Sequence, residues 1–217
     1  MAVLRRRRRT ERGAVAVEAA LVVPLLLIAV IGILEMSMLL KDYLAVTSSV
    51  RSGARIASAS ADAGPGICEV ADDAPPCTPA SSPMLAQVAA DAIQREGSAI
   101  DRDTIDYLLV YKANDQGYPG ANGNTTMPTS CAGIANCVRF RWRPAIDGFR
   151  YAEGSWDSKS VNACVNESDS LGVYLHATHP FITKMFGASM GVAGRSVMRF
   201  EPLADERCKP GRPAAHP

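Results

Sequence analysis

Six cysteines are the residues whose chemistry the sequence shows most directly. They are Cys68, Cys77, Cys131, Cys137, Cys164 and Cys208. An even number of cysteines outside the cytoplasm is typical of disulfide bonding, although the sequence alone cannot choose among the possible pairings. Local spacing favours Cys68 with Cys77 and Cys131 with Cys137, which leaves Cys164 for Cys208. A zinc site is less favoured, because no C-x-x-C pair occurs and the histidines are not interleaved with the cysteines.

Other reactive residue types lack the spacing of a catalytic or metal site. His176 and His179 lie close together, but no acidic residue or cysteine lies near them in the sequence, so we expect scaffold or surface roles. Serine, histidine and aspartate occur without a nucleophile elbow that would align them. Arg139, Arg141 and Arg143 alternate as on the solvated face of a half-buried strand, and binding of an acidic polymer is the less favoured alternative. We therefore expect no enzyme, no metal and no cofactor.

Composition and charge indicate one folded core with an asymmetric N-terminus. The chain has 217 residues, of which 47% are hydrophobic and 21% charged, and its net charge is +1. This length and composition suffice for one sizeable core and exclude a disordered or collagen-like chain. Basic residues crowd the N-terminus at Arg5 to Arg9 and Arg12, whereas the chain from Lys41 onward is nearly neutral. The near-neutral body argues against a nucleic-acid partner.

An apolar run from Ala14 to Leu40 predicts a membrane-spanning helix. As a helix, its 27 residues reach about 40 Å, more than the ~30 Å of a hydrocarbon core. The arginine cluster directly precedes this run, and Lys41 and Asp42 cancel one another beyond it. Basic residues stay on the cytoplasmic side of a span. We therefore expect a single-pass cell-membrane protein with a cytoplasmic N-terminus and an extracytoplasmic body, where disulfides persist.

The boundary between the basic and apolar segments carries the sequence RGAVAVE, from Arg12 to Glu18. It resembles a type IV prepilin processing site. That resemblance implies that a membrane peptidase cuts after Gly13 and leaves Ala14 as the new terminus. Glycine lets the chain lie extended in a protease cleft without a side-chain clash. One departure is Ala19, where pilins often place an aromatic residue.

Two glutamates interrupt the apolar run, and each is costly in lipid. Glu18 and Glu35 are 17 residues apart, about 25 Å along a helix, so both can lie near a membrane face. They point about 100° apart around the axis and cannot form one carboxylate site. One hypothesis pairs Glu18 with the free amine of Ala14 in a neighbouring subunit. The alternative is that Glu18 reaches the headgroups beside Arg12 and has no specific partner.

The sequence GAVAVEAALVVPLLLIAVIGILEMSMLLKDY, followed by VTSSVRSGARIASASAD, is similar to the N-terminal region of TadE-like proteins of the tight-adherence (Flp-type) pilus system. The matching features are Gly13, Glu18, Pro24, Gly32 to Glu35 and Gly53 to Arg55. LGVYLHATHPFITKMFG and RSVMRFEP also resemble the ends of such chains. The resemblance implies a minor pilin or pseudopilin. Its partners would be membrane lipid, other pilin or pseudopilin subunits, the assembly machinery and a prepilin peptidase.

Beyond the membrane, the pattern predicts an α+β domain. We expect a basic leader at 1–13, the span at 14–40, a helical stem at 41–63 and a disulfide-containing domain at 64–217. A second helix follows the cap Ser82 and Pro83 and ends at Gly97. Period-two alternation predicts about four antiparallel strands, at 104–112, 137–143, 171–178 and 192–202. Long loops are expected at 117–137 and 149–170, and a short helix at 180–186.

Three functions remain at this point. The first is a processed pilin-like subunit, and the second is an unprocessed single-pass anchor that displays an extracellular binding module. The third is a secreted protein released by cleavage after Ala59 or Ala61. Signal peptides have apolar segments of ~7 to 15 residues with the cut soon after, which makes the third the poorest fit.

Overall fold

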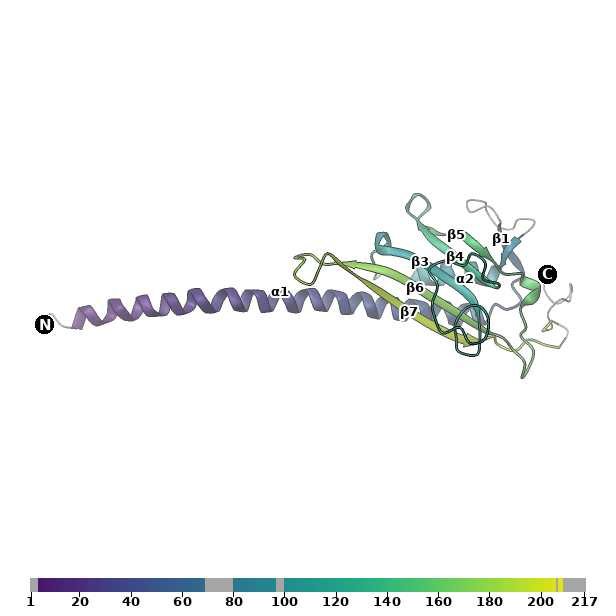
Figure 1. The fold of residues 1–217 in the computed structure, drawn as a ribbon, viewed down its shortest axis with the longest axis horizontal. Coiled ribbons are helices and arrows are strands. Elements are labelled where there is room, and N and C mark those ends of the chain that lie inside the picture. The colour runs from purple at the N-terminus through teal and green to yellow at the C-terminus, as the bar shows by residue number, and fades with distance from the viewer. Residues whose placement is uncertain (1–3, 69–79, 97–99, 206, 209–217) are drawn as a thin grey trace.

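The long N-terminal helix dominates the shape of the molecule. The computed structural model describes residues 4–68, 80–96, 100–205 and 207–208. Helix α1 runs without interruption over 55 residues, Leu4–Ser58, and includes Pro24. Its first part projects from a compact body that packs around its second part (Figure 1). The helix ends five residues before the predicted end of the stem, and turns occupy 59–62.

The body is α+β, as predicted. Its elements are the strands β1 (Pro65–Cys68) and β2 (Ala80–Pro83), helix α2 (Met84–Glu96), and strands β3 (Ile105–Ala113), β4 (Cys137–Arg143), β5 (Gly148–Ser155), β6 (Ser170–Pro180) and β7 (Ser189–Arg199), with short 3-10 turns at Arg102–Thr104, Pro144–Ile146 and Ser158–Ser160. The main sheet has the order β5-β4-β3-β6-β7 and is antiparallel throughout. β1 and β2 form a separate antiparallel pair. Helix α2 is the predicted second helix, but it begins at Met84, because Ser82 and Pro83, expected as its cap and first turn, belong to β2.

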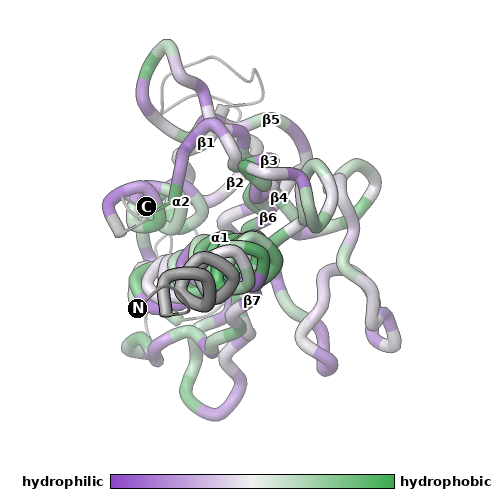
Figure 2. The backbone as a smooth tube through the Cα atoms, turned by 90° about the vertical axis from the view of Figure 1, so that its left-hand side faces the viewer, coloured by the Kyte–Doolittle hydropathy of each residue, from purple (hydrophilic) through white to green (hydrophobic). Residues whose placement is uncertain are grey.

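Small residues let α1 approach its neighbours closely. The buried positions Val46, Val50, Ala54 and Ala57 recur at helical spacing and join the main core. A Cβ on Gly53 would lie 2.7 Å from Cγ1 of Ile93 on α2, and one on Gly194 would lie 2.9 Å from Cγ1 of Val46. Viewed along α1, α2 and the sheet are arranged around it (Figure 2). The second part of α1 is therefore a core element of the domain.

Two sequence expectations about the domain are wrong. The segment 149–170 was expected to be a loop, but its first part is β5, an edge strand that pairs with β4. Its sequence, FRYAEGS, shows weak alternation because an edge strand buries little on either side. The short helix expected at 180–186 does not form. Residues 181–188 instead close the β6–β7 hairpin, with Lys184 and Gly187 in left-handed conformations and the Phe181 N–H donating to the Ala188 carbonyl.

Candidate functional site

The part of α1 between Gly13 and Leu40 is exposed along nearly its whole length. Its large apolar side chains include Leu21, Leu25 and Ile33, each about two-thirds exposed. Within the described part of the chain, Gly13–Ser58 is the one helix long and apolar enough to cross a membrane, and its most apolar stretch is not buried. Such a surface is unstable in water, so it needs lipid or other helices around it.

The candidate processing residues lie inside the helix. Gly13, Ala14 and Glu18 are all exposed helical positions. A Cβ on Gly13 would meet no atom within 4 Å, so packing does not require glycine there. Glycine nevertheless costs about 1 kcal/mol relative to alanine inside a helix. The fold therefore gives no reason for glycine at position 13.

Glu35 differs from Glu18, because the structure buries it against the outer domain. Only 3% of its surface is exposed. Its Oε1 accepts a hydrogen bond of 2.5 Å from the backbone N–H of Thr183, in the loop between β6 and β7. Its Oε2 is also buried and has no hydrogen-bond partner among the described residues. The two glutamates are thus in unlike environments, one open and one enclosed by the protein's own hairpin.

A second contact joins the same hairpin to α1 a short way along the helix. Nδ1 of His179 lies 2.6 Å from Oδ2 of Asp42, and His179 is only 7% exposed. Asp42 also lies 3.9 Å from Nζ of Lys41. Glu35 and Asp42 are seven residues, two helical turns, apart, so they lie on one side of α1. Together the two contacts fix the hairpin along the helix.

Both His176 and His179 have acidic partners, which the sequence did not reveal. His176 pairs with Asp106, with Nδ1 2.7 Å from Oδ2, and the Thr178 hydroxyl donates to the same oxygen. The acidic partners of both histidines come from elements far away in the sequence, so spacing could not reveal them. No group of three or more metal-binding side chains occurs within the described ranges. His176 and His179 are therefore each held by an acidic partner within the scaffold.

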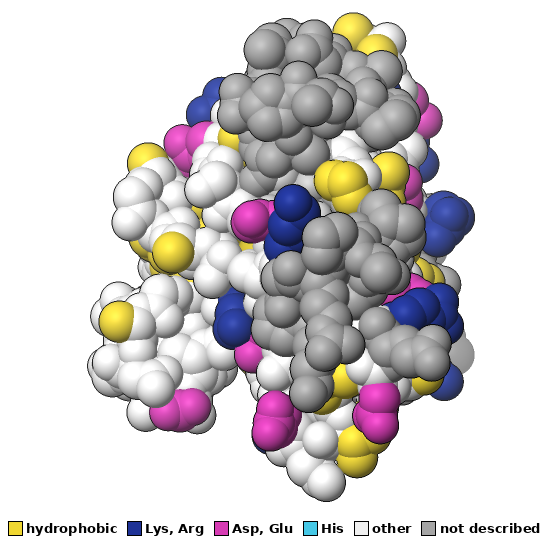
Figure 3. All heavy atoms as spheres, turned by 90° about the vertical axis from the view of Figure 1, so that its right-hand side faces the viewer, with side chains coloured by type: hydrophobic (Ala, Val, Ile, Leu, Met, Phe, Trp, Pro, Cys, Tyr) yellow, Lys and Arg dark blue, Asp and Glu magenta, His cyan; other side chains and the backbone are white. Residues whose placement is uncertain are grey.

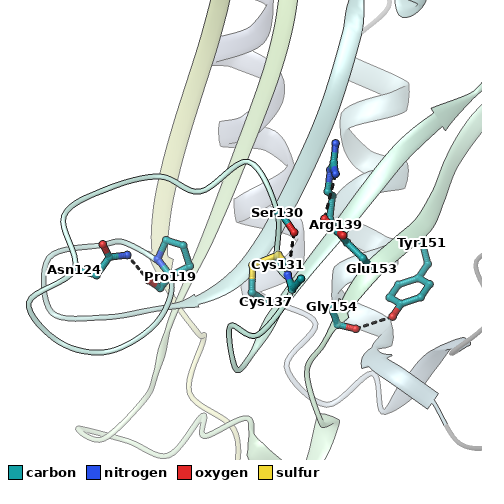
Figure 4. Close-up of a disulfide and its surroundings, with 10 residues drawn as sticks. Pro119, Asn124, Ser130, Cys131, Cys137, Arg139, Tyr151, Glu153 and Gly154 are labelled. Atoms are coloured by element: carbon teal, nitrogen blue, oxygen red, sulfur yellow. Dashed lines mark hydrogen bonds and ion pairs between the residues drawn. A yellow bond between two sulfur atoms is a disulfide. The ribbon is translucent and has the colours of Figure 1, made fainter.

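Two disulfides brace the domain. Cys131 bonds Cys137 at the base of the long loop between β3 and β4 (Figure 4). Cys164 bonds Cys208 near the C-terminus. The Cys131–Cys137 bond packs beneath Tyr107, Leu109 and Tyr111 in a second apolar cluster, on the sheet face away from the helices. Cys77 and the side chain of Cys68 lie outside the described residues, so the pairing of these two stays a prediction.

Arg139 departs from the expected solvated face. Its side chain is only 17% exposed, because it bonds Glu153 on β5 at 3.1 Å and its guanidinium carbon lies 4.9 Å from the centre of the Tyr107 ring. Burial disfavours the charged form of Glu153, but hydrogen bonds from Ser130 and Arg139 and the charge of Arg139 outweigh this and lower its pKa. Arg141 and Arg143 are exposed as expected.

The tyrosines on this face remain neutral at physiological pH. Burial raises the pKa of Tyr107 to about 12, with the neighbouring Tyr174 adding to the effect. Burial also raises the pKa of Tyr111 and of Tyr174. The Tyr107 ring stacks on His176 with centroids 5.3 Å apart. These groups contribute packing and hydrogen bonds, and their raised pKa values give no acid–base chemistry near neutral pH.

Comparison with known proteins gives a family match that lies within α1. Residues 13–55 match the model of the family described as TadE-like protein. The match begins at Gly13 and ends three residues before the end of α1, so it covers the exposed span and most of the packed part. No curated protein and no solved structure matches the chain. Residues 13–55 of the helix are thus similar to the TadE-like family, as the sequence motifs suggested, and the sheet lies outside the match.

Proposed function

Since the apolar helix of this chain is TadE-like, we propose that the protein is a minor pilin or pseudopilin of a tight-adherence pilus. The match and the apolar helix together indicate a single-pass membrane protein connected with this pilus system. In our proposal, the arginine cluster stays in the cytoplasm, the prepilin peptidase cuts after Gly13, and the domain from residue 64 onward lies on the extracytoplasmic side of the membrane.

The observation that carries the proposal is the bare first part of α1. The outer domain packs α1 tightly from Val46 onward but covers almost none of the helix before Glu35. A helix that only anchors a domain needs nothing but lipid around it. Glu18, however, is a charged group on the exposed side of this apolar segment, and its cost in lipid falls if a cation of a neighbouring subunit compensates it.

Processing after Gly13 supplies that cation. Cleavage there would place the new α-amino group of Ala14 four residues, about one helical turn, from Glu18. An amine and a carboxylate from adjacent subunits would then neutralise each other and set the axial register between helices. The fold does not require glycine at position 13. A peptidase that binds residues 12–18 in an extended conformation would favour it, because glycine adopts that conformation without a side-chain clash.

Replacing Glu18 with Gln tests assembly separately from insertion. The variant is produced in cells that lack the wild-type protein, and membrane and sheared surface fractions are probed for the chain and for cross-links to other pilins. We expect Glu18→Gln to reach the membrane normally and to lose most of its pilin cross-links. The matched control is Ser37→Ala, because the Ser37 hydroxyl donates to the Ile33 carbonyl of its own helix. Wild-type levels of cross-linking in Glu18→Gln would refute the pairing, and no cross-links of the wild-type chain would refute the pilin role.

The second candidate, an unprocessed anchor, is favoured by one different observation. The contacts of Glu35 and Asp42 hold the domain at a fixed position on the helix, as a display module on a membrane stalk requires. This candidate predicts that the arginine cluster remains on the mature protein and that Glu18 can be replaced without effect.

A further inference from the structure

The end of the β6–β7 hairpin extends back along α1 toward its N-terminus, beyond the rest of the domain (Figure 1). We name residues 181–188 the hairpin tip. Thr183 of the tip bonds Glu35, and the ring of Phe186 would lie 3.8 Å from a Cβ on Gly32. Both contacts fall inside the apolar run 14–40. The tip therefore lies beside the membrane-spanning segment, whereas the rest of the sheet packs on later turns of α1.

The tip exposes apolar side chains that a water-facing turn would not. Ile182 is 72% exposed and Phe186 52% exposed, and Met185 and the adjoining Met190 are about half exposed. Turns in water favour polar residues, glycine and proline. By contrast, the described residues at the opposite end of the domain show basic and acidic side chains interspersed with scattered apolar ones (Figure 3). The apolar exposure of the domain is thus concentrated where it approaches the span.

The surface of the tip is continuous with the lipid-facing surface of the helix. Phe186 lines a shallow groove together with Gly32, Ile33, Met36 and Leu40 of α1. Ile33, Met36 and Leu40 are themselves largely exposed. If the span is centred in the bilayer, its ~40 Å exceed the ~30 Å hydrocarbon core by about 5 Å on each side, which places Glu35 about 3 Å and Gly32 about 7–8 Å inside the outer hydrocarbon boundary.

The charges at the tip fit the same position. Lys184 is exposed at the turn, and Lys41 is exposed where the apolar run ends. Lysines at a membrane interface extend their ammonium groups toward lipid phosphates while their stems lie along apolar surface. Glu35, the acidic group at this depth, is enclosed by the tip and receives the Thr183 N–H, so it does not face lipid as an open charge.

We propose that the hairpin tip is a membrane-insertion element that sinks Ile182, Met185 and Phe186 into the outer leaflet beside α1, and that Glu35 fixes it there. The partner is the acyl and headgroup region of a lipid bilayer. The inference rests on the membrane span of the proposed function, but not on processing or on assembly with pilins. The outer domain would accordingly lie against the membrane surface at a fixed depth and orientation, instead of swinging on a flexible stalk.

Tryptophan quenching in the full-length chain tests this. Phe186→Trp, Leu26→Trp and Val165→Trp are each reconstituted into nanodiscs of phosphatidylcholine and phosphatidylglycerol, with or without lipids that carry a doxyl quencher on the acyl chain. Leu26 is an exposed residue near the middle of the span, and Val165 is an exposed residue beside the Cys164–Cys208 disulfide, at the other end of the domain. The wild-type chain gives the background of Trp142 and Trp156.

We expect quenchers near the headgroup end of the acyl chain to remove most of the added emission of Phe186→Trp. Quenchers deep in the acyl chain should remove less of it. Leu26→Trp should be quenched most by deep quenchers, and Val165→Trp should not be quenched. Quenching of Leu26→Trp without quenching of Phe186→Trp would overturn the inference and leave the span intact. If neither is quenched, the span fails and the inference fails with it. A Phe186→Trp signal that is unquenched but shifts to the blue as protein concentration rises would mean that another copy covers the tip, which also overturns it.

Discussion

The bond between Glu35 and the hairpin tip yields a sharp prediction about hydrogen exchange at a single amide. The Thr183 N–H donates to a buried carboxylate oxygen, and the Thr183 side chain itself is exposed. Hydrogen bonds to charged groups are worth about 1.5–3 kcal/mol, which corresponds to a roughly ten- to 150-fold slowing of exchange at that amide. Glu35→Ala removes the acceptor and should remove this protection.

Glu35→Gln refines the test, because it keeps an oxygen acceptor but not the charge. A neutral hydrogen bond is worth about 0.5–1.5 kcal/mol, so we expect intermediate protection, roughly two- to tenfold. Exchange is measured by NMR on the full chain in one lipid composition, so that the solvent access of the tip is common to all variants. Ser37→Ala, two residues after Glu35 on α1, is the control and should leave the Thr183 amide protected.

An internal control lies within the hairpin. The Phe181 N–H donates to the Ala188 carbonyl within the hairpin, so its protection should survive Glu35→Ala if the hairpin stays folded. Unchanged protection of Thr183 in Glu35→Ala would refute the reasoning. Loss of protection at both amides would mean that Glu35 supports the hairpin as a whole instead of holding only its tip.

Three further predictions concern the stability of the domain in the full-length protein, followed by thermal unfolding in detergent. Gly53→Val should destabilise the domain by about 1–3 kcal/mol, because any Cβ at this position meets Ile93. The control Ser48→Val, on the exposed face of α1, should have almost no effect. Equal losses of stability in the two variants would contradict the close packing of Gly53 on Ile93. Removing the Cys164–Cys208 bond, whose ends are 44 positions apart in the sequence, should cost about 4 kcal/mol, against about 2 kcal/mol for the Cys131–Cys137 bond, whose ends are six positions apart. The reverse order of melting temperatures would argue against the loop-entropy reasoning. The pKa of Glu153 is lower in the folded protein, so its carboxylate stabilises the domain above the unfolded pKa, and this contribution is lost as pH falls through the folded pKa. Glu153→Gln should therefore lower the melting temperature at neutral pH but not in strong acid. An equal loss of stability at both pH values would refute this prediction.

The span and most of the sheet could be predicted from the sequence because their signals are local. The apolar run is uninterrupted except at Glu18, Glu35 and Ser37, and period-two alternation marks 104–112 and 137–143. β5 was not predicted because an edge strand with Gly154 and few apolar residues carries little periodicity. The expected helix at 180–186 failed because β6 and β7 pair as far as Pro180 and Ser189, so the residues between them form the turn of a hairpin.

The junction between helix and hairpin could not be predicted because its contacts join residues that are far apart in the sequence. Glu35 and Thr183 are 148 residues apart, and Asp42 and His179 are 137 apart. The sequence predicted that Glu35 lies near the outer membrane face, but it did not indicate that the backbone amide of Thr183 donates a hydrogen bond to it. One available signal was the set of apolar residues at 182–186, which is unusual in a turn between two strands.

The mass of the mature protein tests the central claim most directly. We propose that the chain isolated from membranes begins at Ala14 and lacks the arginine cluster, and that Gly13→Leu keeps the full N-terminus. Leucine has room at this position in the fold, so that variant should insert and fold normally. Intact mass spectrometry with N-terminal sequencing decides the matter: a terminus at Ala14 in the wild type alone is the predicted result, and a wild-type protein that retains residues 1–13, or begins beyond residue 57, would contradict it.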